Sequence, residues 1–170
     1  MVNNSPQLLS LVIPVYGSED ILLELLNQIE DVMKEHQYSF EVIFVCDKSP
    51  DKSWKVIKDL SKSYPNVSGI LLRMNAGQHN ALMAGFSQAK GDIVITMDDD
   101  LQHSPSDIHL LVDQIKEGFD VAYGKFKTRK HPLWQILGSK LNDVVAAFLI
   151  GKPKDLYLSP FRAIRTEIIE

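Results

Sequence analysis

The chain has 170 residues, of which 18 are basic and 22 acidic, so its formal net charge is −4. With 45% apolar and 24% charged residues it has the composition of a globular domain, which excludes a disordered or fibrous chain. The mild acidity argues against a general nucleic-acid binder, because such proteins carry a basic face. The single cysteine, Cys46, excludes an internal disulfide framework.

The expected secondary structure alternates short β-branched runs with longer helical stretches. In chain order the strands are Leu9–Val15, Glu41–Cys46, Val67–Leu72, Asp92–Met97 and Asp120–Tyr123, with a further strand-then-helix segment at Phe161–Glu170. We expect helices from a Ser18 cap, from an Asp51 cap, over Asn80–Lys90, and from a Ser104 cap followed by proline. This alternation predicts an α/β fold: a Rossmann-like, mostly parallel sheet with helices on both faces.

No stretch reaches the roughly 20 apolar residues of a membrane-spanning helix; the longest uncharged apolar run is Val144–Gly151. The first six residues lack the charged leader and cleavage site of a signal peptide. From the residues alone we therefore expect a soluble chain.

In doubly wound sheets, ligands bind outside the carboxyl ends of the strands. The polar segments at those ends are Tyr16–Asp20, Asp47–Asp51, Arg73–Asn80 and Asp98–His103. These segments supply the candidate functional residues.

The strongest local signal is the run Asp98-Asp99-Asp100-Leu101-Gln102-His103, which directly follows a hydrophobic strand. Three adjacent carboxylates repel one another, and oxygen ligands suit Mg²⁺ or Mn²⁺. In an extended chain Asp98, Asp100 and Gln102 share one face, whereas Asp99 points elsewhere. A solvated acidic turn before the next helix is the alternative explanation.

Two other strand ends carry weaker signals. Asp47 is the first polar residue after its strand, where a carboxylate can accept a hydrogen bond from a base or a ribose. Arg73, with a glycine turn before the next helix, suits a ligand that bears phosphate. Each also has an ordinary explanation as turn chemistry.

The order and spacing of these motifs resemble the family 2 inverting glycosyltransferases. The motifs are Val12-Ile13-Pro14-Val15-Tyr16 with Glu19, Asp47-x-Ser49-x-Asp51, Arg73-x-Asn75-x-Gly77, Ala89-x-Gly91-Asp92, and Met97-Asp98-x-Asp100-Leu101-Gln102-His103. The chain looks most similar to the polyprenyl-phosphate glycosyltransferases, which include dolichol-phosphate mannose synthases and undecaprenyl-phosphate sugar transferases. Ser159-Pro160-Phe161-Arg162-Ala163 resembles their Ser-Gly-Phe-Arg-Ala motif.

The resemblance implies a GT-A fold and metal-dependent transfer, with inversion, of a sugar from a nucleotide donor, UDP-hexose by preference, to a polyprenyl phosphate. It assigns Pro14, Tyr16, Glu19, Asp47, Arg73 and Asp98 to the nucleotide sugar, and Asp98, Asp100 and Gln102 to Mg²⁺ or Mn²⁺. It assigns Lys125, Ser159 and Arg162 to the acceptor phosphate, and makes Asp98, Asp100 and Arg162 the catalytic set. The resemblance does not settle the sugar or the metal.

The resemblance also suggests how the single catalytic domain, residues 1–170, is organised. Residues 1–123 form the nucleotide-sugar and metal half, and residues 124–170 begin the acceptor half. The second half carries basic residues from Lys125 to His131 and an amphipathic stretch, Leu133–Ile150, which suit a lipid surface or an ordinary loop and helix. Relatives continue with transmembrane helices, so we expect a truncated chain whose full-length form works at the cytoplasmic face of the plasma membrane, with a homo-oligomer left open.

Some residues depart from the family pattern. Cys46 stands where relatives usually have aspartate, and Lys48 where many have glycine, beside the expected contacts with the base and the ribose. Gly124-Lys125 replaces a serine–arginine pair, and Pro160 replaces glycine.

Three alternatives stay open. A saccharide hydroxyl as acceptor would need a general base, for which Asp155 and Glu167 are the late acids on offer. Nucleotidyl transfer would need a glycine- and lysine-rich phosphate loop, which Tyr16-Gly17-Ser18-Glu19 does not supply. A non-catalytic nucleotide-binding module is disfavoured by the presence of Asp98, Asp100, Gln102 and Arg162 together.

Overall fold

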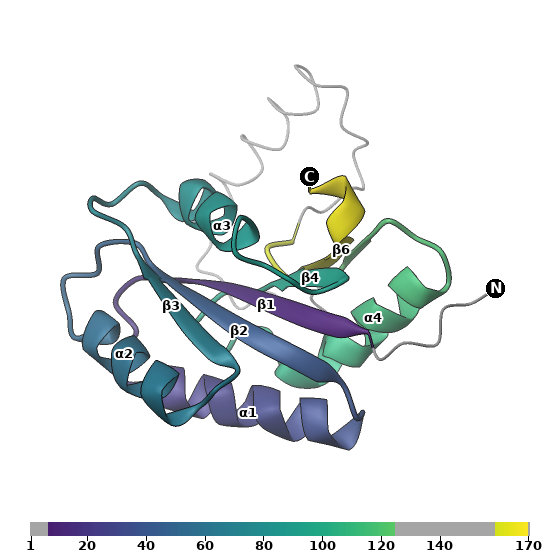
Figure 1. Cartoon of the computed structure of the whole chain (residues 1–170), viewed down its shortest axis with the longest axis horizontal. Coiled ribbons are helices and arrows are strands. Elements are labelled where there is room, and N and C mark those ends of the chain that lie inside the picture. Colours follow the sequence, from purple (N-terminus) through teal and green to yellow (C-terminus); the bar gives the residue numbers. More distant parts are fainter. Residues whose placement is uncertain (1–6, 125–158, 170) are drawn as a thin grey trace, which may run out of the picture. The chain divides into compact units, whose positions relative to one another are not determined.

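The computed structural model describes residues 7–124 and 159–169 (Figure 1). Its strands are β1 (Leu8–Val15), β2 (Ser39–Cys46), β3 (Val67–Leu71), β4 (Ile93–Thr96), β5 (Val121–Tyr123) and β6 (Arg162–Arg165). Its helices are α1 (Leu22–Glu35), α2 (Ser53–Ser63), α3 (Gln78–Phe86) and α4 (Ile108–Lys116), with short 3₁₀ turns at Pro105–Asp107 and Thr166–Ile168.

The six strands form one sheet in the order β3-β2-β1-β4-β6-β5. The β1–β2, β1–β4 and β2–β3 pairs are parallel, and β6 is antiparallel to both β4 and β5. The mostly parallel sheet predicted from the sequence is confirmed. The last strand in the sequence lies inside this sheet, although residues 124–170 were expected to begin the acceptor half.

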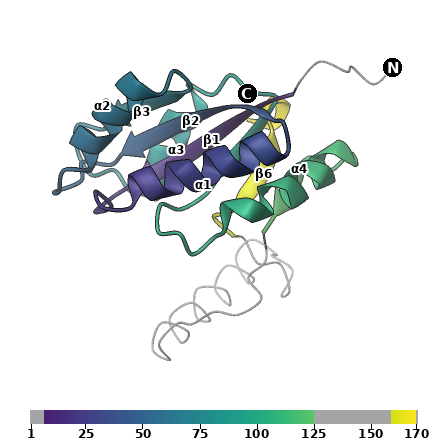
Figure 2. The same cartoon turned by 90° about the horizontal axis from the view of Figure 1, so that it is seen from below.

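Helices cover both faces of the sheet, as predicted: α1, α2 and α4 lie on one face and α3 on the other (Figures 1 and 2). Alternate residues of β1 explain this arrangement. Leu11, Ile13 and Val15 join the core beneath α1, α2 and α4, whereas Val12 joins the smaller core beneath α3. Gly85 lets α3 approach the sheet closely, since a Cβ there would collide with the Val12 side chain.

The predicted Ser18 cap is wrong. Helix α1 begins at Leu22 with Ile21 at its N-cap and has no side-chain cap. The Ser18 hydroxyl instead donates a hydrogen bond to Asp99. This hydrogen bond to a charged acceptor on another segment holds Ser18 three residues before the N-cap position.

The starts of α2 and α4 agree better with the caps predicted from the sequence, whereas the bounds of α3 differ. Asp51 accepts hydrogen bonds from the N–H and the hydroxyl of Ser53, the first residue of α2, although Lys52 holds the N-cap position. Ser104 caps the turn before α4, with proline at the first position. Helix α3 begins at Gln78 and ends at Phe86, not at Asn80 and Lys90 as predicted.

Among the described residues, no helix is long and apolar enough to cross a membrane.

Candidate active site

A pocket of about 250 Å³ opens at the carboxyl ends of the parallel strands. Its wall consists of Pro14, Val15, Tyr16, Asp47, Gln78, Asp98, Asp99 and Asp100. The chain runs from β1 through β2 to β3 on one side and then returns to place β4 on the other side of β1. The pocket therefore lies at the switch point where doubly wound sheets bind ligands.

The carboxylate of Asp98 lies on the pocket wall and accepts a hydrogen bond of 2.6 Å from the Gln78 side chain at the start of α3. Burial and the neighbouring carboxylates of Asp100 and Asp99 raise its pKa from 3.8 to about 6, and the hydrogen bond from Gln78 opposes the rise. This group is therefore held near two other negative charges without a cationic partner among the described residues, which favours the binding of a cation there.

Asp99 lies on the pocket wall and contacts the segment that follows β1. One of its oxygens, Oδ2, accepts hydrogen bonds from the Tyr16 N–H at 3.1 Å and from the Ser18 hydroxyl at 2.5 Å. Burial raises the pKa of Asp99, while these two hydrogen bonds lower it. The sequence had placed Asp99 away from the face of Asp98 and Asp100, and the structure shows what it contacts instead.

Asp100 is exposed on the pocket wall, and its carboxylate accepts a hydrogen bond from the Gln102 N–H at 3.0 Å. Leu101 between them has a φ of 57°, in the left-handed region. This turn leaves Gln102 exposed and off the pocket wall. The structure thus brings Asp98 and Asp100 to one pocket but not the side chain of Gln102.

Asp47 is buried at the end of β2, and its two oxygens accept hydrogen bonds from consecutive backbone N–H groups. The Ala76 N–H lies at 2.7 Å and the Gly77 N–H at 2.8 Å. Gly77 has a φ of 84°, which glycine adopts without strain. Asp47 therefore shapes the loop that precedes α3, besides lining the pocket.

Two predicted nucleotide contacts lie away from the pocket wall. Arg73 is exposed after β3. Glu19 accepts a hydrogen bond from the Lys52 N–H at 2.5 Å, while its own N–H donates to Asp51 at 3.0 Å. Burial by itself would raise the pKa of Asp51, but the hydrogen bonds from Ser49, Ser53 and Glu19 bring it well below its usual value.

The predicted acceptor residues are described only in part. Arg162 begins β6, where its backbone lies in register opposite Thr96 of β4 and Tyr123 of β5. Its side-chain Nε is buried without a hydrogen-bond partner in the described part of the chain. Ser159 is buried. Lys125, the basic residues up to His131 and the amphipathic stretch Leu133–Ile150 lie outside the described residues.

The donor set fits a hard divalent cation shared with a phosphate-bearing ligand. Within residues 7–124 and 159–169, no three histidine, cysteine, aspartate or glutamate side chains converge as a complete metal site. Mg²⁺, however, commonly binds one or two carboxylates and takes its other ligands from substrate phosphates and water. Asp98 and Asp100 supply such a pair.

Sequence reasoning included Gln78 only within the candidate segment Arg73–Asn80 and gave it no role, and it missed the contacts that Asp99 makes with Tyr16 and Ser18. Gln78 directly follows the glycine turn after β3, so its place at a helix start was a usable signal. The contacts of Asp99 had no local signal, because they join segments about 80 positions apart in the sequence.

The chain is similar in sequence to transferases from Proteus and Aeromonas. The 162 aligned residues of the undecaprenyl-phosphate 4-deoxy-4-formamido-L-arabinose transferase of Proteus mirabilis (strain HI4320) are 38% identical and cover 95% of this chain and 50% of that protein. The enzyme of the same name from Aeromonas hydrophila is 37% identical over 171 residues, covering 100% of this chain and 52% of its own length. The chain thus spans about half the length of these relatives.

A solved structure of the glucosyl-3-phosphoglycerate synthase of Mycobacterium tuberculosis with Mn²⁺, UDP-glucose and phosphoglyceric acid has the same fold. Its TM-score is 0.73 at 16% identity, and the match covers 95% of this chain and 57% of that chain. This likeness confirms the GT-A fold predicted from the sequence. A family model described as "Glycosyl transferase family 2" matches residues 10–169. The chain therefore belongs to glycosyl transferase family 2.

Proposed function

We propose that this chain is the donor-binding part of a glycosyltransferase that moves a sugar from a UDP-sugar to a polyprenyl phosphate, undecaprenyl phosphate by preference, with inversion and with Mg²⁺ or Mn²⁺. The observation that carries the proposal is the pocket at the β1–β4 switch point, where Asp98 and Asp100 share one wall with Pro14 and Tyr16. This wall combines a place for a cation with a place for a nucleotide.

The polyprenyl-phosphate acceptor is supported by the relatives that carry the name undecaprenyl-phosphate 4-deoxy-4-formamido-L-arabinose transferase. That name contains a pentose derivative, so the hexose expected from the resemblance stays a prediction and the donor panel has to include both kinds of sugar. UDP is the nucleotide to test first, because the neighbour of the same fold was solved with UDP-glucose and Mn²⁺.

The roles proposed for the residues follow from their chemistry. Pro14 and Tyr16 line the nucleotide, and Asp98 and Asp100 hold the cation, which when bound stabilises the negative charge of the leaving diphosphate. Asp47, on the pocket wall, contacts the nucleotide base while its carboxylate accepts the N–H groups of residues 76 and 77. Arg73, Glu19 and Gln102 do not line the pocket, so their contacts with the ligand stay predictions from the resemblance.

The acceptor is already anionic at neutral pH, so it needs positioning more than deprotonation. An oxygen of the acceptor phosphate bonds to the anomeric carbon from the face opposite the leaving group, the carbon–oxygen bond to the donor diphosphate breaks, and the nucleoside diphosphate leaves. In this proposal Arg162 gathers the acceptor charge with Ser159 and Lys125. Among the described residues, the buried Nε of Arg162 has no hydrogen-bond partner, which supports such a role, since a guanidinium binds phosphate strongly.

The proposal has three further parts. They are contact with a membrane surface through residues 125–150 or through parts of a longer protein, a place at the cytoplasmic face, and a homo-oligomer.

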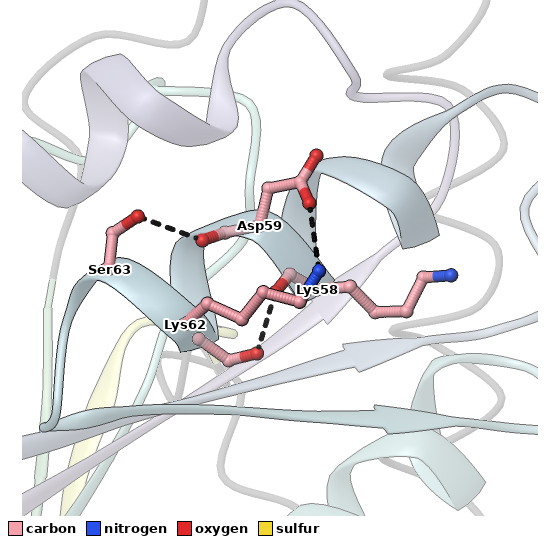
Figure 3. A network of polar contacts seen from close by, with 5 residues as sticks. Lys58, Asp59, Lys62 and Ser63 are labelled. Atoms are coloured by element: carbon pink, nitrogen blue, oxygen red, sulfur yellow. Dashed lines mark hydrogen bonds and ion pairs between the residues drawn. The ribbon is translucent and has the colours of Figure 1, made fainter.

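The test is product formation by the protein with undecaprenyl phosphate in detergent, Mn²⁺ and a panel of UDP- and GDP-sugars, with mass spectrometry of the extracted lipid. The proposal predicts a lipid-linked sugar whose formation stops with Asp100→Ala and continues with Asp59→Ala, an exposed carboxylate on α2 (Figure 3). Transfer to a saccharide hydroxyl and not to the lipid would contradict the proposed acceptor.

A further inference from the structure

Four consecutive backbone N–H groups, those of residues 16–19, are held by side chains of other segments. They donate to Asp99 Oδ2 at 3.1 Å, Ser49 Oγ at 2.8 Å, Ser53 Oγ at 3.1 Å and Asp51 Oδ2 at 3.0 Å, in chain order. The conformation of this segment is therefore set by the loop between β2 and α2, by Ser53 at the start of α2 and by the acidic run after β4, since its four N–H groups have partners outside it.

Asp99 is the one of these four acceptors that comes from the acidic run. Its Oδ2 also accepts the Ser18 hydroxyl at 2.5 Å, so one oxygen holds two donors of the 16–19 segment. Asp99 is covalently flanked by Asp98 and Asp100, and Tyr16 lies on the same pocket wall as those two carboxylates. A displacement of residues 16–18 would therefore change the pocket between Tyr16 and the proposed cation ligands.

We propose that Asp99 is a positioning residue, which fixes the 16–19 segment against the acidic run so that the nucleotide wall and the cation ligands stay in register. This inference rests on the proposed donor site. It assigns Asp99 the role of a hydrogen-bond acceptor toward the protein's own Tyr16 N–H and Ser18 hydroxyl, not that of a cation ligand.

The two roles make different demands on the side chain. An acceptor of two hydrogen bonds through one oxygen can be replaced by asparagine, whose amide oxygen takes the place of Oδ2. A cation ligand or a source of negative charge loses its charge in the same replacement, so asparagine would weaken the binding of the cation. Ser18→Ala removes one of the two donors and leaves all three carboxylates in place.

The experiment measures the Kd of UDP at saturating Mn²⁺, and the Mn²⁺ midpoint at saturating UDP, for Asp99→Ala, Asp99→Asn and Ser18→Ala. Matched controls come from the exposed surface of α2: Asp59→Ala removes a carboxylate that pairs with Lys62 at 3.5 Å, and Ser63→Ala removes a hydroxyl bonded to the Asp59 carbonyl (Figure 3).

We expect Asp99→Ala and Ser18→Ala to weaken UDP binding about tenfold, the effect of losing a hydrogen bond of ordinary strength. Asp99→Asn should stay within about threefold of the parent chain on the same scale, and none of the three variants should shift the Mn²⁺ midpoint more than about twofold. Both controls should behave like the parent. Amide hydrogen exchange at Tyr16 should be faster in Asp99→Ala and unchanged in Asp99→Asn.

A Mn²⁺ midpoint that rises equally in Asp99→Ala and Asp99→Asn would overturn the positioning role and make Asp99 a cation ligand. UDP binding unchanged in both Asp99→Ala and Ser18→Ala would also overturn it. If Asp99→Ala does not fold, Ser18→Ala and Asp99→Asn decide between the same outcomes. Failure of the parent chain to bind UDP would instead refute the proposed donor site, so the two failures are distinguishable.

Discussion

The buried carboxylate of Asp47 accepts the backbone N–H of Gly77 at 2.8 Å, from a position 30 residues earlier in the chain. With its second oxygen on the Ala76 N–H, Asp47 joins the end of β2 to the start of α3. Gln78, the next residue, then reaches Asp98 at 2.6 Å. The pocket wall is therefore a chain of contacts among three loops, and its members are the natural targets for mutation.

Replacing Asp47 with alanine should lower the free energy of unfolding by about 1–3 kcal/mol, because two backbone N–H groups at exposed residues lose a charged, buried acceptor. Urea denaturation measures this loss. Ser63→Ala, which removes one hydrogen bond on the exposed surface of α2, should change stability by less than about 0.5 kcal/mol. An Asp47→Ala chain as stable as the parent would show that these N–H groups find other partners.

Replacing Asp98 with asparagine should raise the melting temperature of the metal-free protein at pH 7. Burial and two neighbouring carboxylates disfavour its charge, and the amide removes that charge while its oxygen can still accept the hydrogen bond from Gln78. The same variant should lose the stabilisation that Mn²⁺ with UDP gives the parent. Thermal melts in a chelator and then in Mn²⁺ with UDP measure both effects. Asp31→Asn, at an exposed position of α1, should leave both unchanged.

Asp51 should make stability depend on pH in the acid range. Because hydrogen bonds hold its folded-state pKa below its unfolded value of 3.8, its contribution is fully present above that value and is lost as the pH falls toward the folded-state pKa. Asp51→Ala should therefore be less stable than the parent at pH 7, by about 0.5–1.5 kcal/mol, the usual net contribution of a hydrogen bond at a partly exposed site. The difference should narrow below pH 3.8, as measured by urea denaturation across pH. A difference that widens toward acid would contradict this account.

Adding one methyl group at Gly85 should destabilise the packing of α3 on the sheet. An alanine Cβ there would collide with Val12 and lie 3.2 Å from Val45, so the helix must shift. We expect a loss of about 1–3 kcal/mol, the usual size of overpacking. Ser87→Ala, at an exposed position just after the same helix, should change stability by less than about 0.5 kcal/mol in the same denaturation experiment.

The alternation of buried strands and amphipathic helices was readable from the sequence because each element carries its own periodicity. The position of β6 was not, since nothing within Arg162–Arg165 says that this strand lies between β4 and β5 and runs antiparallel to both. The start of α1 was misread because Ser18 looks like a cap locally, while its actual partner, Asp99, lies 81 positions away.

In the candidate site, too, some features could be predicted from the sequence and others could not. Tyr16, Asp47, Asp98 and Asp100 lie in polar segments that were predicted from the strand ends, whereas Pro14 was assigned by the family resemblance. The structure gathers all five in one pocket. Gln102 was expected to share the face of Asp100, but the left-handed turn at Leu101 breaks the extended geometry on which that expectation depended. Strand-end position is a topological property that the sequence reveals, whereas loop conformation depends on distant hydrogen bonds.

The most direct test of the central claim is calorimetric titration of UDP and GDP into this chain, with and without Mn²⁺, beside Asp100→Ala and Asp59→Ala. The account predicts UDP binding that requires Mn²⁺, is lost in Asp100→Ala and is kept in Asp59→Ala. UDP binding that is indifferent to both Mn²⁺ and Asp100, or a folded parent chain that binds neither nucleotide, would contradict it.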